Sequence, residues 1–158
     1  MRYDTQDKYL ADAFATVKRY DPATYQRMDA DHKWFVTTDF SILPEQMYSP
    51  EMETAFGTTW TDKNPGLKMA VTFIYADYIN DWADEKGVDR TYFAAAVLVH
   101  EYRHAHQDDM GPAAEVPAFA AGSAFAAKLP PGHSEQAIKH LSDTTGAEAK
   151  RAAMAGQR

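Results

Sequence analysis

Val-His-Glu-Tyr-Arg-His, at positions 99–104, places two histidines four residues apart, with a glutamate directly after the first. On an α-helix, residues i and i+4 lie on the same face, one turn apart. The imidazoles of His100 and His104 are therefore expected to reach a single cation, with Glu101 beside them. The stretch predicts a helix that carries a metal site.

The residues around this stretch predict a helix over about residues 90–108. Residues 92–99 are all apolar or aromatic, as in a helix that other parts of the fold surround. Asp89 is a favourable N-cap for its first turn. Gly111 and Pro112 indicate that the helix has ended before them.

Two histidines and a glutamate in this pattern are typical of a catalytic zinc site. Such a site has three protein ligands and an open fourth position. Zinc lowers the pKa of water bound there, and a nearby carboxylate takes its proton as the water attacks a carbonyl. We therefore expect Zn2+ as the cofactor, His100 and His104 as ligands, and Glu101 as the catalytic base.

The composition of the whole chain suits one globular domain. Of its 158 residues, 45% are hydrophobic and 13% are aromatic, which is enough for a single core. A formal net charge of −7 makes nucleic acid and anionic membranes poor candidates for partners. The absence of cysteine excludes disulfides and cysteine-ligated zinc.

The chain shows no targeting or membrane pattern. Residues 1–7 lack the apolar segment of a signal peptide. No apolar run approaches the ~20 residues that are needed to span a bilayer. We expect a cytoplasmic protein, with secretion by a signal-free route left open.

Periodicity and turn residues predict the other elements. Residues 5–19 have the apolar spacing of an amphipathic helix. Three segments rich in β-branched and aromatic residues predict strands, at 32–40, 54–61 and 67–75, and the turn at 62–66 predicts that the last two pair antiparallel. Further expectations are an acidic connector or short helix at 76–86, a helix from about Glu115 or Pro117 to Lys128, and a short helix from Ser134 through Leu141. Residues 1–142 are expected to form one domain, and residues 143–158 a flexible tail.

This order of elements, with His-Glu-x-x-His on a helix after a small sheet, resembles the zincin metallopeptidases. The resemblance covers about residues 33–128 and rests on His100, Glu101 and His104. It implies an α+β fold in which a small antiparallel or mixed sheet packs on the active-site helix, followed by C-terminal helices. In that family the strand nearest the cleft pairs with an extended substrate, and residues 54–61 or 67–75 are the candidates.

The third ligand distinguishes the branches of that family. The metzincin branch needs a glycine at position 107 and a histidine at position 110, where this chain has Gln107 and Met110. The gluzincin branch takes a glutamate from the next helix, and residues 115–118 (Glu-Val-Pro-Ala) resemble its Glu-x-x-Ala signature. The resemblance therefore implies Glu115 as the third ligand. Pro117 is tolerated only in a first helical turn, which would leave Glu115 at or just before the helix start.

Several supporting roles stay open at this point. Asp108 shares the face of His100 but lies ~12 Å further along the helix axis, too far to share its metal. The alternative third ligands are His133, Glu135 and His140. Candidates for the partners of metal-bound histidines are Asp81, Asp108 and Asp109, and Gln107 is expected to hydrogen-bond within the site. Candidates for stabilising an oxyanion are Tyr75, Tyr78, His133 and His140.

The resemblance implies a zinc metallopeptidase that hydrolyses peptide bonds in a peptide or protein substrate, using a zinc-bound water activated by Glu101. The first alternative is a zincin-like metal-binding interaction or regulatory module without peptidase activity. The second alternative is a structural domain whose motif is accidental. The third is an enzyme of the same chemistry that hydrolyses a non-protein amide, or a toxin-type effector domain cut from a longer polypeptide. Nothing in the sequence specifies an oligomeric state.

Overall fold

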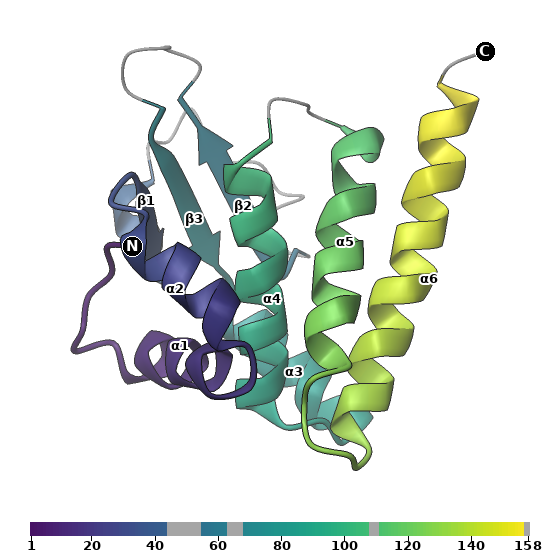
Figure 1. Ribbon diagram of the computed structural model, residues 1–158, viewed down its shortest axis with the longest axis horizontal. Coiled ribbons are helices and arrows are strands. Elements are labelled where there is room, and N and C mark those ends of the chain that lie inside the picture. Colours follow the sequence, from purple (N-terminus) through teal and green to yellow (C-terminus); the bar gives the residue numbers. More distant parts are fainter. Residues whose placement is uncertain (44–54, 63–67, 108–110, 157–158) are drawn as a thin grey trace.

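The computed structural model describes residues 1–43, 55–62, 68–107 and 111–156. Helices and strands are coloured along the chain in Figure 1. In chain order, they are α1 (Lys8–Tyr20), α2 (Pro22–Ala30), β1 (Trp34–Thr37), a 3-10 turn (Phe40–Ile42), β2 (Gly57–Thr61), β3 (Ala70–Ile74), α3 (Ala76–Lys86), α4 (Arg90–Ala105), α5 (Pro112–Ala126) and α6 (Ser134–Ala155).

The three described strands form one mixed sheet in the order β1-β3-β2. β1 runs parallel to β3, with Trp34 opposite Ala70. β2 runs antiparallel to β3, with Thr59 opposite Thr72, so the predicted antiparallel pairing is confirmed. The chain therefore has an α+β fold with a small mixed sheet, in which β3 is central and β2 forms an edge.

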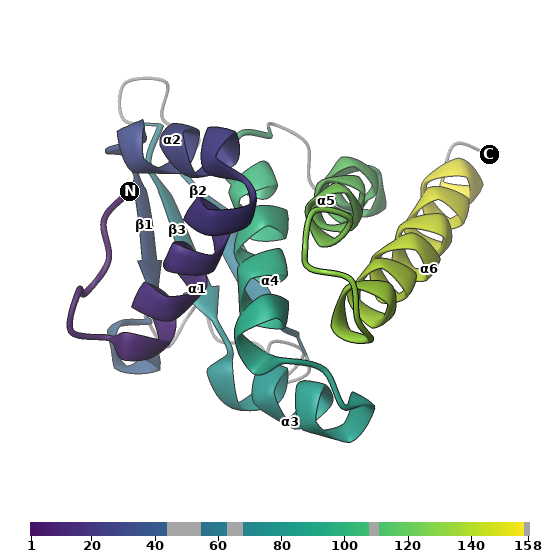
Figure 2. The same cartoon turned by 60° about the horizontal axis from the view of Figure 1, so that its bottom comes forward.

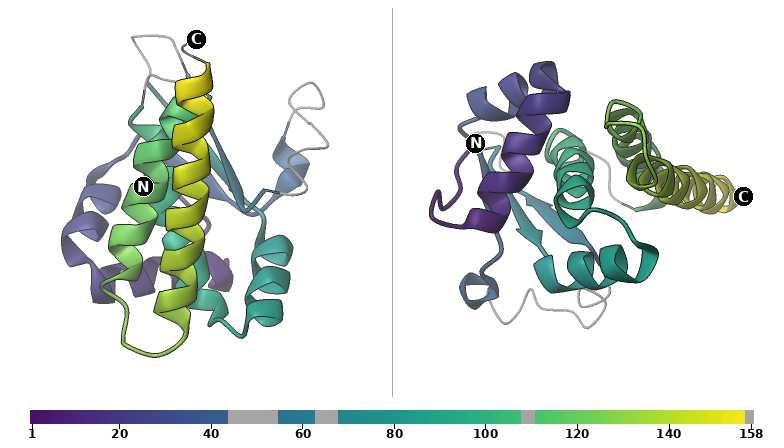
Figure 3. Two further views of the ribbon diagram at one scale, coloured as in Figure 1. Left: turned by 90° about the vertical axis from the view of Figure 1, so that its right-hand side faces the viewer. Right: turned by 90° about the horizontal axis from the view of Figure 1, so that it is seen from below.

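Helix α4 lies at the centre of the molecule. It packs against β2 and β3 on one side and against α5 on another, while α1 lies beside it. Figure 2 shows α4 between the sheet and the pair formed by α5 and α6, and the two views of Figure 3 show that this pair runs antiparallel and stands to one side of the sheet. Within the described ranges, no helix has both the length and the apolar character needed to cross a membrane.

The sequence of α4 explains its central place. Its side chains from Phe93 to Val99 are all buried, so this part of the helix is covered on every side. The side chain of Asp89 accepts a hydrogen bond from the backbone N–H of Tyr92 at 2.9 Å, which confirms the predicted N-cap. The helix ends at Ala105, three residues before the predicted end.

Capping residues determine where the N-terminal helices begin. Helix α1 starts at Lys8, later than predicted, because the side chain of Asp7 caps it by accepting from the N–H of Leu10. Helix α2 was not predicted, although Asp21 at its N-cap and Pro22 at its first position are standard start signals. Residues 76–86 were predicted as an acidic connector or a short helix, and they form helix α3. Gly87 ends α3 in the left-handed conformation that glycine adopts readily.

Two expectations about the C-terminal helices are corrected. Helix α5 begins at Pro112, so Pro117 lies inside it rather than in its first turn, and Glu115 lies within the helix. Helix α6 does not stop at Leu141, and residues 143–155 continue it where a flexible tail was expected. Small residues let α6 pack closely on α5, since an added Cβ on Gly122 would lie 3.3 Å from Ser142 Oγ. This tertiary contact stabilises a helix that local composition alone does not specify.

Asp21 lies between α1 and α2 and contacts the segment that follows α5, and we expect Asp21→Ala to destabilise the protein. Its carboxylate accepts from the N–H and hydroxyl of Thr24 at 3.3 and 2.7 Å and pairs with Lys128 Nζ at 3.0 Å. Loss of the cap costs about 1–2 kcal/mol of unfolding free energy, measured by urea denaturation at neutral pH. Asp12→Ala is the control, because its exposed pair with Lys8 contributes less than about 1 kcal/mol.

The effect of Asp21→Ala should depend on pH. Burial opposes ionisation of Asp21, but hydrogen bonds from Thr24 and Lys128 outweigh it and lower the pKa of Asp21. Because the pKa of Asp21 is lower in the folded state, its ionised carboxylate stabilises the folded protein at pH values above the pKa of an unfolded carboxyl. This contribution is lost as the pH falls through the pKa of the folded state. The stability difference between the two proteins should therefore shrink below about pH 3.8. A difference that stays constant under acid would contradict this account.

Candidate metal centre

His100 and His104 project from the same side of α4, one turn apart. Their Nε2 atoms lie 3.2 Å from each other, so both rings present the same nitrogen to one point. Both side chains are mostly buried. The ring of Phe119 packs edge-on against His100, with 4.4 Å between ring centroids, and restricts its orientation.

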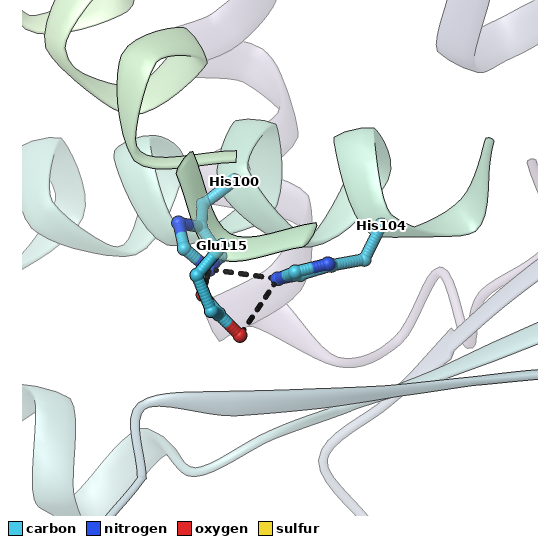
Figure 4. Close-up of side chains that lie close together, drawn as sticks. All are labelled: His100, His104 and Glu115. Atoms are coloured by element: carbon cyan, nitrogen blue, oxygen red, sulfur yellow. Dashed lines mark hydrogen bonds and ion pairs between the residues drawn. The ribbon is translucent and has the colours of Figure 1, made fainter. Parts of the chain in front are cut away.

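Glu115 reaches these histidines from the first turn of α5. Its Oε2 lies 3.2 Å from His100 Nε2 and its Oε1 lies 3.2 Å from His104 Nε2, as Figure 4 shows. Gly111, just before the helix, has φ 88°, a conformation that residues with a Cβ rarely adopt. Pro112 at the first helical position then starts α5, and Glu115 faces α4 three residues later.

The distances among these three side chains fit a zinc ion. Bonds of about 2.0–2.1 Å in a tetrahedral site place neighbouring ligand atoms about 3.3–3.4 Å apart. The two histidine Nε2 atoms are 3.2 Å apart, and each lies 3.2 Å from a different carboxylate oxygen of Glu115. Among the described residues, His100, His104 and Glu115 are the group whose ligand atoms lie close enough to hold a metal ion.

The electrostatics of the cluster also suit a cation. Burial opposes protonation of His104, but contacts with Glu115 and the charge of Glu101 outweigh it and raise the pKa of His104. Burial likewise opposes ionisation of Glu115, yet its contacts with His100 and His104 lower the pKa of Glu115 to about 2. The cluster thus favours an ionised Glu115 and favours positive charge near the two imidazole rings.

Gln107 fixes the orientation of one ring. Its Oε1 lies 3.0 Å from His104 Nδ1, so this nitrogen donates its hydrogen to the amide oxygen. When the ring is neutral, as a metal ligand must be, the Nε2 atom of His104 then has its lone pair directed at the cluster. The predicted hydrogen bond of Gln107 within the site is present in this form.

Glu101 lies beside the cluster without belonging to it. Only 4% of its surface is exposed, and its Oε1 lies 3.9 Å from His100 Nε2. Its Oε2 accepts a hydrogen bond of 2.6 Å from the hydroxyl of Thr59 on β2. One carboxylate oxygen is therefore held by the sheet, and the other is turned toward His100.

A cavity of about 330 Å³ opens from the cluster. His100, Glu101 and Glu115 line its polar end, and its walls come from β2, α4, α5 and α6. Most wall residues are apolar, and the largest are Phe56, Phe93, Val97, Phe119, Ile138 and Leu141. The site therefore joins three potential ligands and a carboxylate to a space suited to an apolar group.

The alternative ligands lie elsewhere. His133 and Glu135 are at the turn between α5 and α6, and Glu115 is separated from that end of α5 by eleven residues, about 16 Å of helix. Glu135 accepts from the N–H of Gly132 at 2.8 Å. His140 is exposed on α6. None of the three belongs to the group of described residues that could hold a metal ion.

Three other residues that were predicted to support the site, Tyr75, Tyr78 and Asp81, lie away from the cluster. Tyr75 donates to Thr58 at 3.4 Å on the sheet face opposite α4, and Tyr78 packs on Phe56. Asp81 is on α3, near Arg90. Asp108, Asp109 and Met110 lie outside the described residues. In the described lining of the cavity, none of the four predicted oxyanion candidates is present.

Strand β2 contributes two residues beside Glu101 that were not predicted as parts of the site. Thr59 contacts Glu101, and Gly57 approaches it so closely that a Cβ there would lie 2.9 Å from Glu101 Cγ. Both were treated only as parts of a predicted strand. Strand alternation would place both on one face, but no sequence signal pairs that face with Glu101.

Comparisons with protein-family models, with curated proteins and with solved structures give no match.

Proposed function

We propose that this protein is a zinc-dependent metallopeptidase with a zincin-like arrangement of the gluzincin kind. The observation that carries the proposal is the set of three 3.2 Å contacts among His100, His104 and Glu115, with a carboxylate oxygen of Glu101 beside them. The three side chains would hold the ion. When bound, zinc supplies a Lewis acid that polarises a carbonyl and lowers the pKa of water.

Glu101 would move the proton during hydrolysis. Its Oε1 accepts a proton from the attacking water as that O–H bond breaks and the oxygen adds to the carbonyl carbon. The same oxygen then gives the proton to the amide nitrogen as the C–N bond breaks, which releases the amine. Burial of Glu101 keeps bulk water from competing for this proton.

Two features would bind a peptide. β2 lies at an edge of the described sheet, so an extended substrate could pair with its free backbone groups. The cavity beside the cluster would receive an apolar side chain next to the cleaved bond, because its wall is largely aromatic and aliphatic. The expected substrate is therefore an extended peptide or protein segment with a large apolar residue at the cleavage site.

The absence of the predicted oxyanion candidates from the described cavity lining favours one alternative, a metal-binding interaction or regulatory module without peptidase activity. The position of Glu101 argues against it, because a site that only binds metal has no use for a buried carboxylate beside the ligands.

Metal analysis and peptide cleavage together test the proposal. Protein purified without chelators or a histidine tag should contain about one zinc per chain by elemental mass spectrometry, as one catalytic site requires. A mixed peptide library should be cut beside large apolar residues. A zinc chelator should stop cleavage, and added zinc should restore it.

The outcomes separate the alternatives. Zinc without cleavage of any peptide would favour the metal-binding module. Protein that takes up no zinc, even after addition of zinc and dialysis, would contradict both functions and leave the histidine pair as packing.

A further inference from the structure

A chain of three hydrogen bonds runs from the core to Glu101. Trp34 Nε1 donates to Thr72 Oγ1 at 2.8 Å, and Thr72 Oγ1 lies 2.7 Å from Thr59 Oγ1. Thr59 Oγ1 lies 2.6 Å from Glu101 Oε2. Trp34 and Thr72 are fully buried, and Thr59 and Thr72 are directly opposite each other on β2 and β3.

The groups at the two ends of this row of hydrogen bonds determine the direction in which the hydrogens are donated. The indole N–H of Trp34 can only donate, and an ionised Glu101 can only accept. Thr72 therefore accepts from Trp34 and donates to Thr59, and Thr59 donates to Glu101. Thr59 also lies 3.4 Å from the backbone oxygen of Glu101, but its single hydrogen favours the shorter contact to the charged oxygen.

The direction of the chain decides which oxygen of Glu101 is free. A proton on Oε2 would have to be donated to Thr59, whose own hydrogen would then have only the backbone oxygen of Glu101, 3.4 Å away, or Thr72 as its acceptor. Either the short bond to a charged oxygen is replaced by a long one, or the hydroxyl of Thr72 loses its acceptor in the core, and both changes are costly. The chain therefore reserves Oε2 as an acceptor and leaves Oε1, the oxygen nearer His100, to carry a proton.

Gly57 limits the position of Glu101 from a second direction. It lies two residues before Thr59 on the same face of β2. A Cβ at this position would lie 2.9 Å from Glu101 Cγ and 3.0 Å from Oε1. The strand thus holds one carboxylate oxygen through Thr59 and admits the rest of the side chain through the missing Cβ of Gly57.

We propose that Thr59 is a positioning residue, which the chain from Trp34 and Thr72 orients so that Glu101 keeps Oε1 free for the proton of the attacking water. This inference rests on the proposed metallopeptidase function. It assigns to β2 a role in catalysis through Glu101, in addition to the binding of substrate.

Substitutions at position 59 test the proposal in zinc-loaded protein. Thr59→Val keeps the shape of the side chain but removes the donor, and it should lower kcat by up to about 100-fold with little change in KM, because misplacement of a catalytic group by about 1 Å has an effect of this size. Thr59→Ser keeps the hydroxyl donor and should have a kcat close to that of the wild type.

Gly57→Ala should lower kcat in the same way as Thr59→Val. Thr58→Val is the matched control, because its side chain lies on the opposite face. Unchanged zinc content in all four variants would show that the ligands are intact.

Thermal melting of zinc-free protein gives a readout that does not depend on activity. Thr59→Val, Glu101→Met and the double variant form a double-mutant cycle. The fall in Tm of the double variant should be smaller than the sum of the two single falls, because either change alone leaves a buried polar group unpaired. Additive falls, or a Thr59→Val enzyme with the kcat of the wild type, would overturn the proposal. If the wild type hydrolyses no peptide, the proposed function fails, and the cycle still decides whether Thr59 holds Glu101.

Discussion

Glu101→Gln should keep one zinc per chain and lose hydrolysis, with kcat lower by about 10²–10⁴-fold, the usual contribution of a general base. The change is conservative in shape, and the amide oxygen can still accept from Thr59. An amide cannot take the proton of the attacking water at the position of Oε1. The measurement is steady-state cleavage of the best library peptide, with zinc content determined on the same sample.

Glu85→Gln is the matched control for this experiment. Glu85 is exposed on α3, away from the cavity, and the same chemical change there should leave kcat and KM as in the wild type. If Glu101→Gln retained wild-type activity, the assignment of the base would be wrong. If it lost zinc as well as activity, Glu101 would be acting as a ligand or as a structural support of the ligands.

Glu115→Ala should abolish tight zinc binding. The substitution removes the Glu115 carboxylate, which contacts both histidines, and it leaves two imidazoles on α4. Loss of outer partners alone weakens metal sites about 10–100-fold, so loss of a direct ligand should weaken zinc affinity by more than about 100-fold. Competition with a chromogenic chelator measures the affinity. Zinc at 100 times the dissociation constant should stabilise the wild type by about 2.7 kcal/mol and the variant hardly at all.

The zinc-free proteins test the direction in which stability changes with pH. The pKa of Glu115 is lowered from 4.5 to about 2 by its contacts with His100 and His104, against the effect of burial. This contact therefore stabilises the folded wild type above about pH 4.5, and the stabilisation is lost as the pH falls toward 2. Glu115→Ala should lack this part of the acid sensitivity, which thermal melting across that range would show.

Glu135→Ala and His140→Ala serve as controls for Glu115→Ala and as tests of the alternative ligands. Glu135 is at the far end of the helical pair and His140 is exposed, so both variants should bind zinc as the wild type does. Unchanged affinity in Glu115→Ala would reject it as the third ligand and return attention to His133, Glu135 and His140.

The prediction of α4 and of the hairpin depended on local pattern. A run of apolar residues, the cap at Asp89 and the spacing of His100 and His104 are all contained within about one helix, and the structure has them as expected. The strands at 57–61 and 70–74 pair antiparallel as the turn residues between them indicate. The predicted placement of Pro117 was wrong, because Pro112 starts the helix earlier and Pro117 is accommodated within it.

The sequence by itself determined which side chains share one face of α4, because the 3.6-residue period sets the distance between His100 and His104 within a single helix. Only the tertiary structure decided what lies opposite that face. Glu115 comes to the histidines because Gly111 and Pro112 turn α5 back along α4, and Thr59 reaches Glu101 across 42 positions of the chain. Such contacts depend on how whole elements pack, since no local spacing relates a residue on an edge strand to a residue on the helix that covers it.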